Sequence, residues 1–162
     1  MQDNKTLWVV ITTILVAVFA YSLFFNSPTY TVTFDSDGGT TISEQAIRRN
    51  RFAEVLENPV REGYQFVGWM VNDELVELSE KAITGNTTFK ALWEAKTYTI
   101  TFDSGRGTEV EPIEVNHGEA ASRPTNPTRD NRRFHYWSYE GERFNWDTPI
   151  YQDKELVAVW RR

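Results

Sequence analysis

Few side chains in this sequence have the type and spacing that catalysis or metal binding requires. The histidines are His117 and His135, and there is no cysteine, so a zinc ion would depend on these two residues and carboxylates. Neither histidine lies in a motif that supplies further ligands or a positioned partner for general-base catalysis. We interpret them as a surface-loop and an exposed strand residue. We expect no enzyme activity, no catalytic residue, no metal site and no cofactor.

One segment has the beginning of a calcium-loop pattern, because Asp35, Asp37 and Gly39 follow the spacing Asp-x-Asp-x-Gly. An EF-hand also needs an oxygen ligand at the fifth position and a glutamate at the twelfth, and here these positions are Gly39 and Ala46. A later copy of the segment has Gly105 in place of Asp37. We therefore expect a hairpin turn, in which aspartate binds its own backbone and glycine supplies a positive φ.

The chain contains the same segment twice. Residues 30–36 read Tyr-Thr-Val-Thr-Phe-Asp-Ser, and residues 98–104 read Tyr-Thr-Ile-Thr-Phe-Asp-Ser. The offset of 68 residues also relates Trp69 to Trp137, and it has slipped to 67 near the end of the chain. A period of this length is a whole small domain, since the units of a solenoid usually take about 20–50 residues. The sequence predicts two tandem modules more readily than one catalytic pocket.

The two copies separate fold residues from candidate contact residues. Rings found in both copies are expected in the core. Tyr139 and Tyr151 instead correspond to Val71 and Thr84, so the fold does not require rings there. Exposed tyrosines are common contact residues, although many have no partner. Tyr139 and Tyr151 are the partner-binding candidates, and the partner itself is unknown.

Each copy is expected to form a small α+β unit. Alternating apolar and polar residues and the turn residues between them predict, in the first copy, strands at 30–34, 41–47, 63–70 and 88–93 and a short helix or turn at 51–57. Phe66 and Trp69 are three residues apart, so a bulge at Gly68 is expected to bring both rings to one face. The second copy has Tyr136 at that position, which leaves its bulge open.

The N-terminal part is a long apolar stretch. Leu7 to Phe25 is 19 residues without a charge, and as a helix it would be about 28 Å long, close to the ~30 Å hydrocarbon core of a bilayer. We expect an uncleaved transmembrane signal-anchor with the C-terminal modules outside the cell. The alternative is a cleaved signal peptide and secretion, but Ala20-Tyr21-Ser22, a weak cleavage site, falls inside the apolar run.

The motifs resemble one family. The first copy has three motifs in a fixed order: Tyr-x-Val-x-Phe-Asp-x-x-Gly-Gly, then Pro-x-Arg-x-Gly-Tyr-x-Phe-x-Gly-Trp, then x-Ala-x-Trp. This order is similar to the B-repeat of internalin B type, also called the Listeria–Bacteroides repeat. The first copy carries Asp35, Gly38, Gly39, Pro59, Arg61, Gly63, Tyr64, Phe66, Gly68, Trp69, Ala91 and Trp93. The second carries Asp103, Gly107, Pro127, Arg129, Phe134, Trp137, Ala158 and Trp160, and it departs from the motif at Arg106, Asn131, Arg132 and Tyr136.

The resemblance implies small domains of β-grasp-like (ubiquitin-like) fold on bacterial surface proteins, associated with adhesion. The expected organisation is a cytoplasmic tail 1–6, a transmembrane helix 7–25, a spacer 26–28 and repeats at 29–96 and 97–162. The expected function is a membrane-anchored cell-envelope protein that binds a protein or a cell-wall polysaccharide without catalysis. The alternative is a structural spacer without a ligand. A net charge of −6 and scattered basic residues argue against nucleic acid as a partner.

Overall fold

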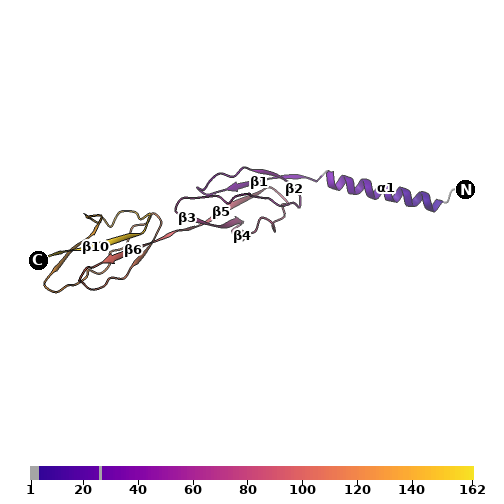
Figure 1. The fold of residues 1–162 in the computed structure, drawn as a ribbon. Coiled ribbons are helices and arrows are strands. Elements are labelled where there is room, and N and C mark those ends of the chain that lie inside the picture. The colour runs from indigo at the N-terminus through magenta and orange to yellow at the C-terminus, as the bar shows by residue number, and fades with distance from the viewer. Residues whose placement is uncertain (1–3, 26) are drawn as a thin grey trace. The chain divides into compact units, whose positions relative to one another are not determined.

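The computed structural model describes residues 4–25 and 27–162, with the side chains of residues 4–7, 20 and 22–25 left aside. Over these residues the chain forms one helix and ten strands (Figure 1). The elements are α1 (Asn4–Phe25), β1 (Thr29–Asp35), β2 (Gln45–Arg48), β3 (Tyr64–Val71), β4 (Glu74–Val76), β5 (Thr87–Ala95), β6 (Thr97–Asp103), β7 (Ile113–Asn116), β8 (Arg133–Tyr139), β9 (Glu142–Arg143) and β10 (Lys154–Arg161).

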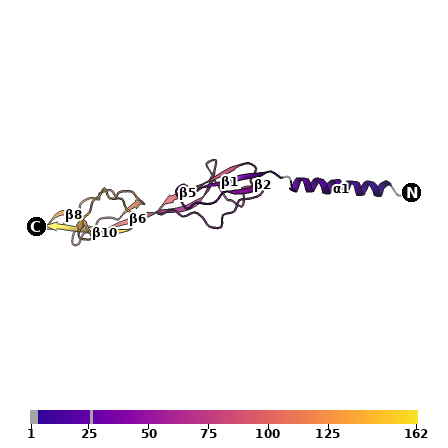
Figure 2. The same ribbon diagram turned by 90° about the horizontal axis from the view of Figure 1, so that it is seen from above.

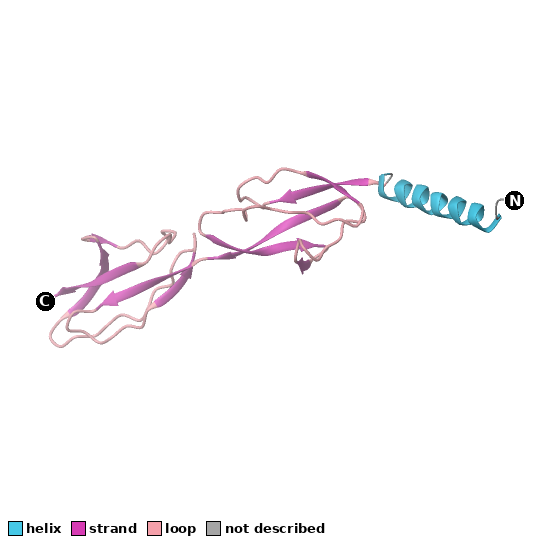
Figure 3. Cartoon of the chain, turned by 45° about the vertical axis from the view of Figure 1, so that its right-hand side comes forward, coloured by secondary structure: helices cyan, strands magenta, loops and turns pink. Residues whose placement is uncertain are grey.

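The two copies fold into two five-stranded sheets with the same topology. The strand orders are β2-β1-β5-β3-β4 and β7-β6-β10-β8-β9. In each sheet the first strand of the copy pairs in parallel with its last strand, and Phe34 lies opposite Phe89 in one such pair. The strands of both sheets are the magenta arrows of Figure 3. The predicted tandem duplication is therefore confirmed as two sheet domains.

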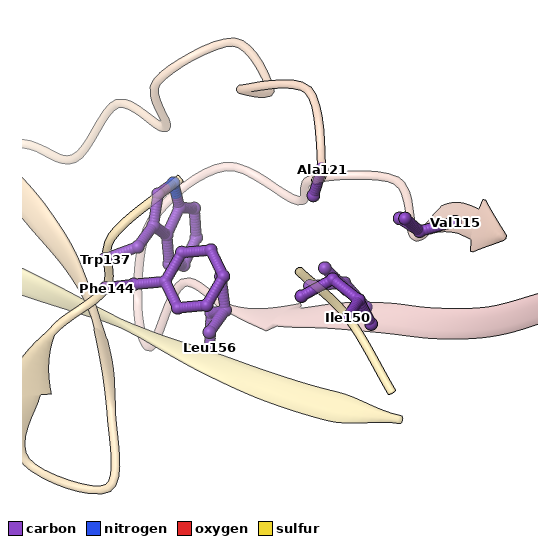
Figure 4. Packing of buried hydrophobic residues seen from close by; sticks show 7 residues of the cluster. Val115, Ala121, Trp137, Phe144, Ile150 and Leu156 are labelled. Carbon is purple, nitrogen blue, oxygen red and sulfur yellow. The ribbon is translucent and has the colours of Figure 1, made fainter. Parts of the chain in front are cut away.

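Each sheet has a core of its own, built from the apolar face of its central strands. In the first sheet Phe34 stacks on Phe89, with ring centroids 5.6 Å apart, and meets Trp69 edge-on at 5.1 Å. In the second, Trp137 packs on Phe102 at 4.8 Å. Figure 4 shows Trp137, Phe144 and Leu156 side by side in this core. The prediction that Trp69 and Trp137 are core residues is confirmed, because they are 4% and 3% exposed.

A short helix or turn was expected at 51–57; no helix is formed there, and residues 27–162 contain no helix. The backbone groups of this segment bind elsewhere: Asn50 N donates to Ile83 O at 2.8 Å, Ile83 N donates to Arg51 O at 2.8 Å, and the Gln45 side chain binds the backbone of Glu54. A helix would need those groups for bonds four residues along the chain. The α+β class of each repeat is thereby corrected to all-β, and the β-grasp-like helix is missing.

The second sheet has a bulge one residue before Tyr136, the residue that corresponds to Gly68 of the first repeat. In the pairing of β8 with β10, Phe134 lies opposite Trp160 and Tyr136 lies opposite Val159, so His135 is the extra residue. The bulge allows Phe134 and Trp137, three residues apart, to face the core together with ring centroids 5.4 Å apart. Tyr136 therefore does not prevent the bulge.

The short edge strands β4 and β9 were not expected from the sequence. Each follows a two-residue turn in which both residues have positive φ: Asn72 (50°) and Asp73 (64°) before β4, and Glu140 (50°) and Gly141 (88°) before β9. Such turns match the twist of a hairpin, and Asn, Asp and Gly adopt the conformation most easily. Asn72-Asp73 was thus the signal for an additional hairpin.

Helix α1 is drawn as a single continuous helix (Figure 2). Its side chains Trp8, Leu15 and Phe19 are 61–66% exposed. Among the residues whose side chains are described, no helix combines the length and apolar character needed to cross a membrane. The predicted transmembrane role of residues 7–25 is therefore not confirmed. Residues 1–3 of the predicted tail and residue 26 of the predicted spacer lie outside the described residues.

Backbone contacts divide the chain into two compact units. The first consists of Met1–Pro59 and Gly68–Leu92, and the second of Val60–Val67 and Trp93–Arg162. The boundaries 29–96 and 97–162 drawn from the sequence stay a prediction. In the second unit, Lys96 N donates a hydrogen bond to Gly63 O at 2.9 Å.

Replacing Asn86 with alanine should lower the free energy of unfolding by about 1 kcal/mol, the usual net contribution of one hydrogen bond. Asn86 Oδ1 accepts the backbone N–H of Thr31 at 3.0 Å, and Asp153 Oδ1 accepts that of Thr99 at 2.9 Å at the equivalent place in the second sheet. Asn86→Asp should therefore be nearly neutral. Urea unfolding of both variants checks this, and an equal loss for alanine and aspartate would contradict it.

Candidate functional site

The segment with the calcium-loop spacing is a hairpin turn, as predicted. Asp37 N donates to Asp35 Oδ1 at 3.0 Å, and Gly39 N donates to Ser36 O at 2.9 Å. Gly38 has a φ of 87°. In the second copy Gly105 N donates to Asp103 Oδ1 at 2.7 Å, so the same turn forms without a second aspartate. The described part of the chain holds no group of three or more His, Asp or Glu that fits a metal ion.

The structure places the two candidate tyrosines in different surroundings. Tyr139 is half-buried at the end of β8, accepts a hydrogen bond from Gln152 Nε2 at 3.2 Å, and lies 3.9 Å below the Lys154 ammonium. Tyr151 lies in the loop before β10 and is 58% exposed. Its ring meets that of His117 edge-on, with centroids 4.9 Å apart. Only Tyr151 therefore offers most of its surface to a partner.

His117 has a packing role within the second unit. It is half-buried in the turn after β7, and its Nδ1 lies 3.2 Å from the hydroxyl oxygen of Tyr98. Its ring also contacts those of Tyr64 and Tyr151, at centroid distances of 5.8 and 4.9 Å. A histidine surrounded by three tyrosines is fixed in place by aromatic edges and one hydrogen bond. This explains His117 without a metal or a substrate.

The most distinctive surface feature is a hollow of about 140 Å³ in the second sheet domain. Strand β8 and its hairpin partner β9 supply one wall, and the loops before β8 and after β9 supply the other. Its lining includes Arg123, Asn126, His135, Tyr136, Arg143 and Trp146, together with Pro124 and the core rings Phe134, Trp137 and Phe144. No carboxylate lines it. We call this feature the β8–β9 hollow.

Aromatic rings hold the arginines of the β8–β9 hollow in position. The guanidinium of Arg143 lies 5.6 Å from the ring centroid of Tyr136, and that of Arg123 lies 6.0 Å from the ring centroid of Trp146. Trp146 in turn stands perpendicular to Phe144, with centroids 5.0 Å apart. Such cation–π contacts orient a guanidinium without neutralising it. The hollow therefore presents positive charge and hydrogen-bond donors between flat rings.

Comparison with known sequences identifies the architecture. The chain matches the Listeria-Bacteroides repeat domain at residues 30–92 and again at residues 98–159. The chain belongs to this family. The resemblance found in the sequence is thus confirmed, and the two matched segments cover most of the two five-stranded sheets. The family found is a repeat domain and no enzyme family is matched.

Two proteins of Evansella cellulosilytica are similar to this chain. One, named "Putative membrane protein", is 32% identical over 142 residues, which is 81% of this chain and 21% of that protein. The other, named "Putative Gly-rich membrane protein", is 28% identical over 134 residues, which is 81% of this chain and 14% of that protein. This chain therefore spans about a fifth or less of the relatives it matches.

The β8–β9 hollow was missed from the sequence, although comparison of the two Listeria–Bacteroides repeats held the signal. His135 and Tyr136 stand where the first repeat has Val67 and Gly68, and Arg143 stands where it has Leu75. In the sequence alone, Tyr136 bears only on whether the second repeat has a bulge, because its place beside Arg143 depends on the hairpin.

His135 should titrate below the ordinary histidine value of 6.5. Desolvation, together with the positive charges of Arg161 and Arg143, lowers its pKa. Because the unfolded chain then takes up the proton first, stability is fully present above pH ~6.5 and falls as the pH drops through the pKa of the folded state. NMR titration of the ring protons measures the midpoint, and Arg143→Leu should raise it. An unshifted midpoint in both proteins would contradict the arrangement.

Proposed function

We propose that this chain is a membrane-attached protein of the cell envelope that displays two Listeria–Bacteroides repeats for non-catalytic contact with a protein or a cell-wall glycan. The observation that carries the proposal is the domain organisation of the chain, in which two repeats of one surface family follow an apolar helix. The names of the two relatives support a membrane location.

Helix α1 is the segment we assign to the bilayer. The exposed apolar side chains of α1, such as Val16 and Phe19, are 68% and 66% exposed. Isolated apolar side chains on a surface are ordinary, but a continuous apolar surface of this kind is stable only when lipid or another apolar surface covers it. The described ends of the apolar run carry Trp8 and Tyr21, and such rings favour the membrane interface. The repeats would then lie on the outer side of the membrane.

Protease treatment of intact cells tests this topology. A protease added from outside should remove the repeats, and N-terminal sequencing of the purified protein should find residues 7–25 still attached to them. Protected repeats would overturn the orientation. A mature N-terminus after residue 22 would replace attachment through α1 by secretion, the alternative that Ala20-Tyr21-Ser22 leaves open.

Binding tests the contact function. The full chain in a non-ionic detergent should capture a specific component from the detergent-solubilised envelope of its own cells. A control variant of this chain, in which the exposed side chains are exchanged among positions so that the net charge is unchanged, should not. Failure to capture any component from repeated preparations would favour the spacer, in which the repeats only separate other parts of a protein. Substrate turnover by the purified chain would overturn both the binding function and the spacer.

A further inference from the structure

The β8–β9 hollow has no counterpart of the same chemistry in the first repeat. The register of the β3–β4 hairpin, with Leu75 opposite Met70, matches that of the β8–β9 hairpin, with Arg143 opposite Ser138. The 68-residue offset therefore holds at these positions. At the positions of Arg123, Asn126, His135, Tyr136, Arg143 and Trp146 the first repeat has Val55, Asn58, Val67, Gly68, Leu75 and Leu78, so only the asparagine is shared. If the fold required these side chains, both repeats would carry them. The differences between the repeats therefore concern the surface of the second repeat.

One pair of positions shows how the two surfaces differ. In the first repeat a Cβ added to Gly68 would lie 2.8 Å from Leu75 Cδ1, so the leucine side chain lies over the glycine and would have to move to admit a larger residue. In the second repeat the same two positions hold Tyr136 and Arg143, and the guanidinium lies 5.6 Å from the ring centroid. The aliphatic pair has thus been replaced by a ring that orients a cation.

The hollow is positive although the chain has a net charge of −6. Arg143 and Arg161 are both close enough to His135 to act on its protonation. Within residues 27–162 neither Arg123 nor Arg143 forms an ion pair, so their donors remain available. A guanidinium binds carboxylate and phosphate groups through paired hydrogen bonds. The complementary ligand is therefore anionic and rich in acceptors.

The size of the hollow indicates what kind of anion it fits. A volume of about 140 Å³ is smaller than the roughly 300–1,000 Å³ of sites that enclose a whole small molecule or cofactor. It suits one unit of a polymer that continues over the surface. The ring of Trp146, held edge-on by Phe144, offers an apolar plane for the C–H face of a sugar ring, while Asn126 offers both a donor and an acceptor for hydroxyl groups.

We propose that the β8–β9 hollow binds an acidic sugar unit of an anionic glycan, with Arg143 and Arg123 on its carboxylate or phosphate and Trp146 against its ring. The site names the ligand class for the binding function proposed above and rests on it. Tyr136 acts as a positioning residue, because it holds the Arg143 guanidinium at the wall of the hollow. The first repeat, which has Val55, Leu75 and Leu78 in place of the two arginines and the tryptophan, does not bind this ligand.

Isothermal titration of the full chain in a non-ionic detergent tests the proposal with four polymers. Polygalacturonate carries carboxylates on sugars, phosphomannan carries phosphates on sugars, dextran is neutral, and poly-L-glutamate is an acidic peptide. At least one anionic glycan should bind about tenfold or more tightly than dextran and poly-L-glutamate, a difference of about 1.4 kcal/mol. The tighter of the two glycans identifies the anionic group.

Variants taken from the first repeat locate the site. Arg143→Leu and Trp146→Leu introduce the residues found at positions 75 and 78, which the same fold already accommodates. Each should weaken glycan binding by about tenfold or more, the effect of losing one charged or stacking contact. Arg106→Ala removes the same charge from an exposed turn outside the hollow and should leave the affinity unchanged. Circular dichroism confirms that all three variants are folded.

Several results would overturn the proposal. They are no binding of either anionic glycan, equal or tighter binding of poly-L-glutamate, and glycan binding that both hollow variants retain. Capture of an envelope component that survives Arg143→Leu and Trp146→Leu would leave the proposed function standing and remove this site. If the chain captures no envelope component at all, the proposed function fails whichever polymer binds.

Discussion

Replacing Phe89 with alanine is expected to unfold the first sheet and leave the second one folded. Phe89 is fully buried, lies in the central strand β5, and stacks on Phe34. A buried Phe→Ala change costs about 3–5 kcal/mol, and an unaided core of this size supplies only about 3–5 kcal/mol in total. The second sheet keeps its fully buried core of Ile100, Ile150 and Leu156. Amide hydrogen exchange, read separately for the two sheets, measures the result.

A matched control distinguishes burial from the loss of any apolar side chain. Leu75 lies in the edge strand β4 of the same sheet and is 56% exposed. Leu75→Ala should change the stability of the first sheet by only about 0.5 kcal/mol, as most surface substitutions do. If the Phe89 variant kept slow exchange in β1 and β5, the core described for this sheet would be wrong. If both sheets lost protection together, their stabilities would not be independent.

Replacing Gly63 with alanine is expected to destabilise the second unit through two separate effects. Gly63 is buried with a φ of 74°, a conformation that costs an L-residue about 1–2 kcal/mol. An added Cβ would also overlap the imidazole ring of His117, and overpacking of this kind typically costs about 1–3 kcal/mol. Urea unfolding of the chain, followed by the fluorescence of the tryptophans in the second unit, measures the sum.

A double-mutant cycle separates the two effects. His117→Ala removes the ring that the Cβ would meet, so the double variant Gly63→Ala/His117→Ala should lose less stability than the sum of the single variants. The remaining penalty of Gly63→Ala in the His117→Ala background should be the backbone cost alone. Strict additivity would mean that the glycine is needed only for its φ and that the ring can move away freely.

Local patterns in the sequence were sufficient for the strands but not for the connections between them. The alternation at 30–34 and the apolar run at 88–93 lie inside β1 and β5, and 63–70 overlaps β3. The second expected strand was too long, because only Gln45–Arg48 pairs with β1. The helix expected at 51–57 does not form because the backbone at its start is hydrogen-bonded to Ile83, a residue distant in sequence. No helical propensity within the segment reveals that competition.

The candidate site shows the same limit. Tyr151 is an exposed ring, as expected. The expectation could be drawn from the sequence alone, because the first repeat has Thr84 at this position. The β8–β9 hollow needs two further facts, the two-residue turn that folds β9 back on β8 and the bulge at His135. Together they bring Arg143 beside Tyr136. Without the hairpin, these residues are only scattered basic and aromatic positions in an acidic chain.

The parallel pairing of the first and last strands of each repeat determines how the module responds to mechanical tension. The chain enters β1 at Thr29 and leaves β5 at Ala95, and the parallel register places these points at opposite ends of the pair. A pull through the chain therefore acts along the strands and shears all the hydrogen bonds of the pair together, so that none can open first. Resistance to such a force depends on the rate of unfolding and not on the equilibrium free energy. A repeat of low thermodynamic stability can in this way still carry load.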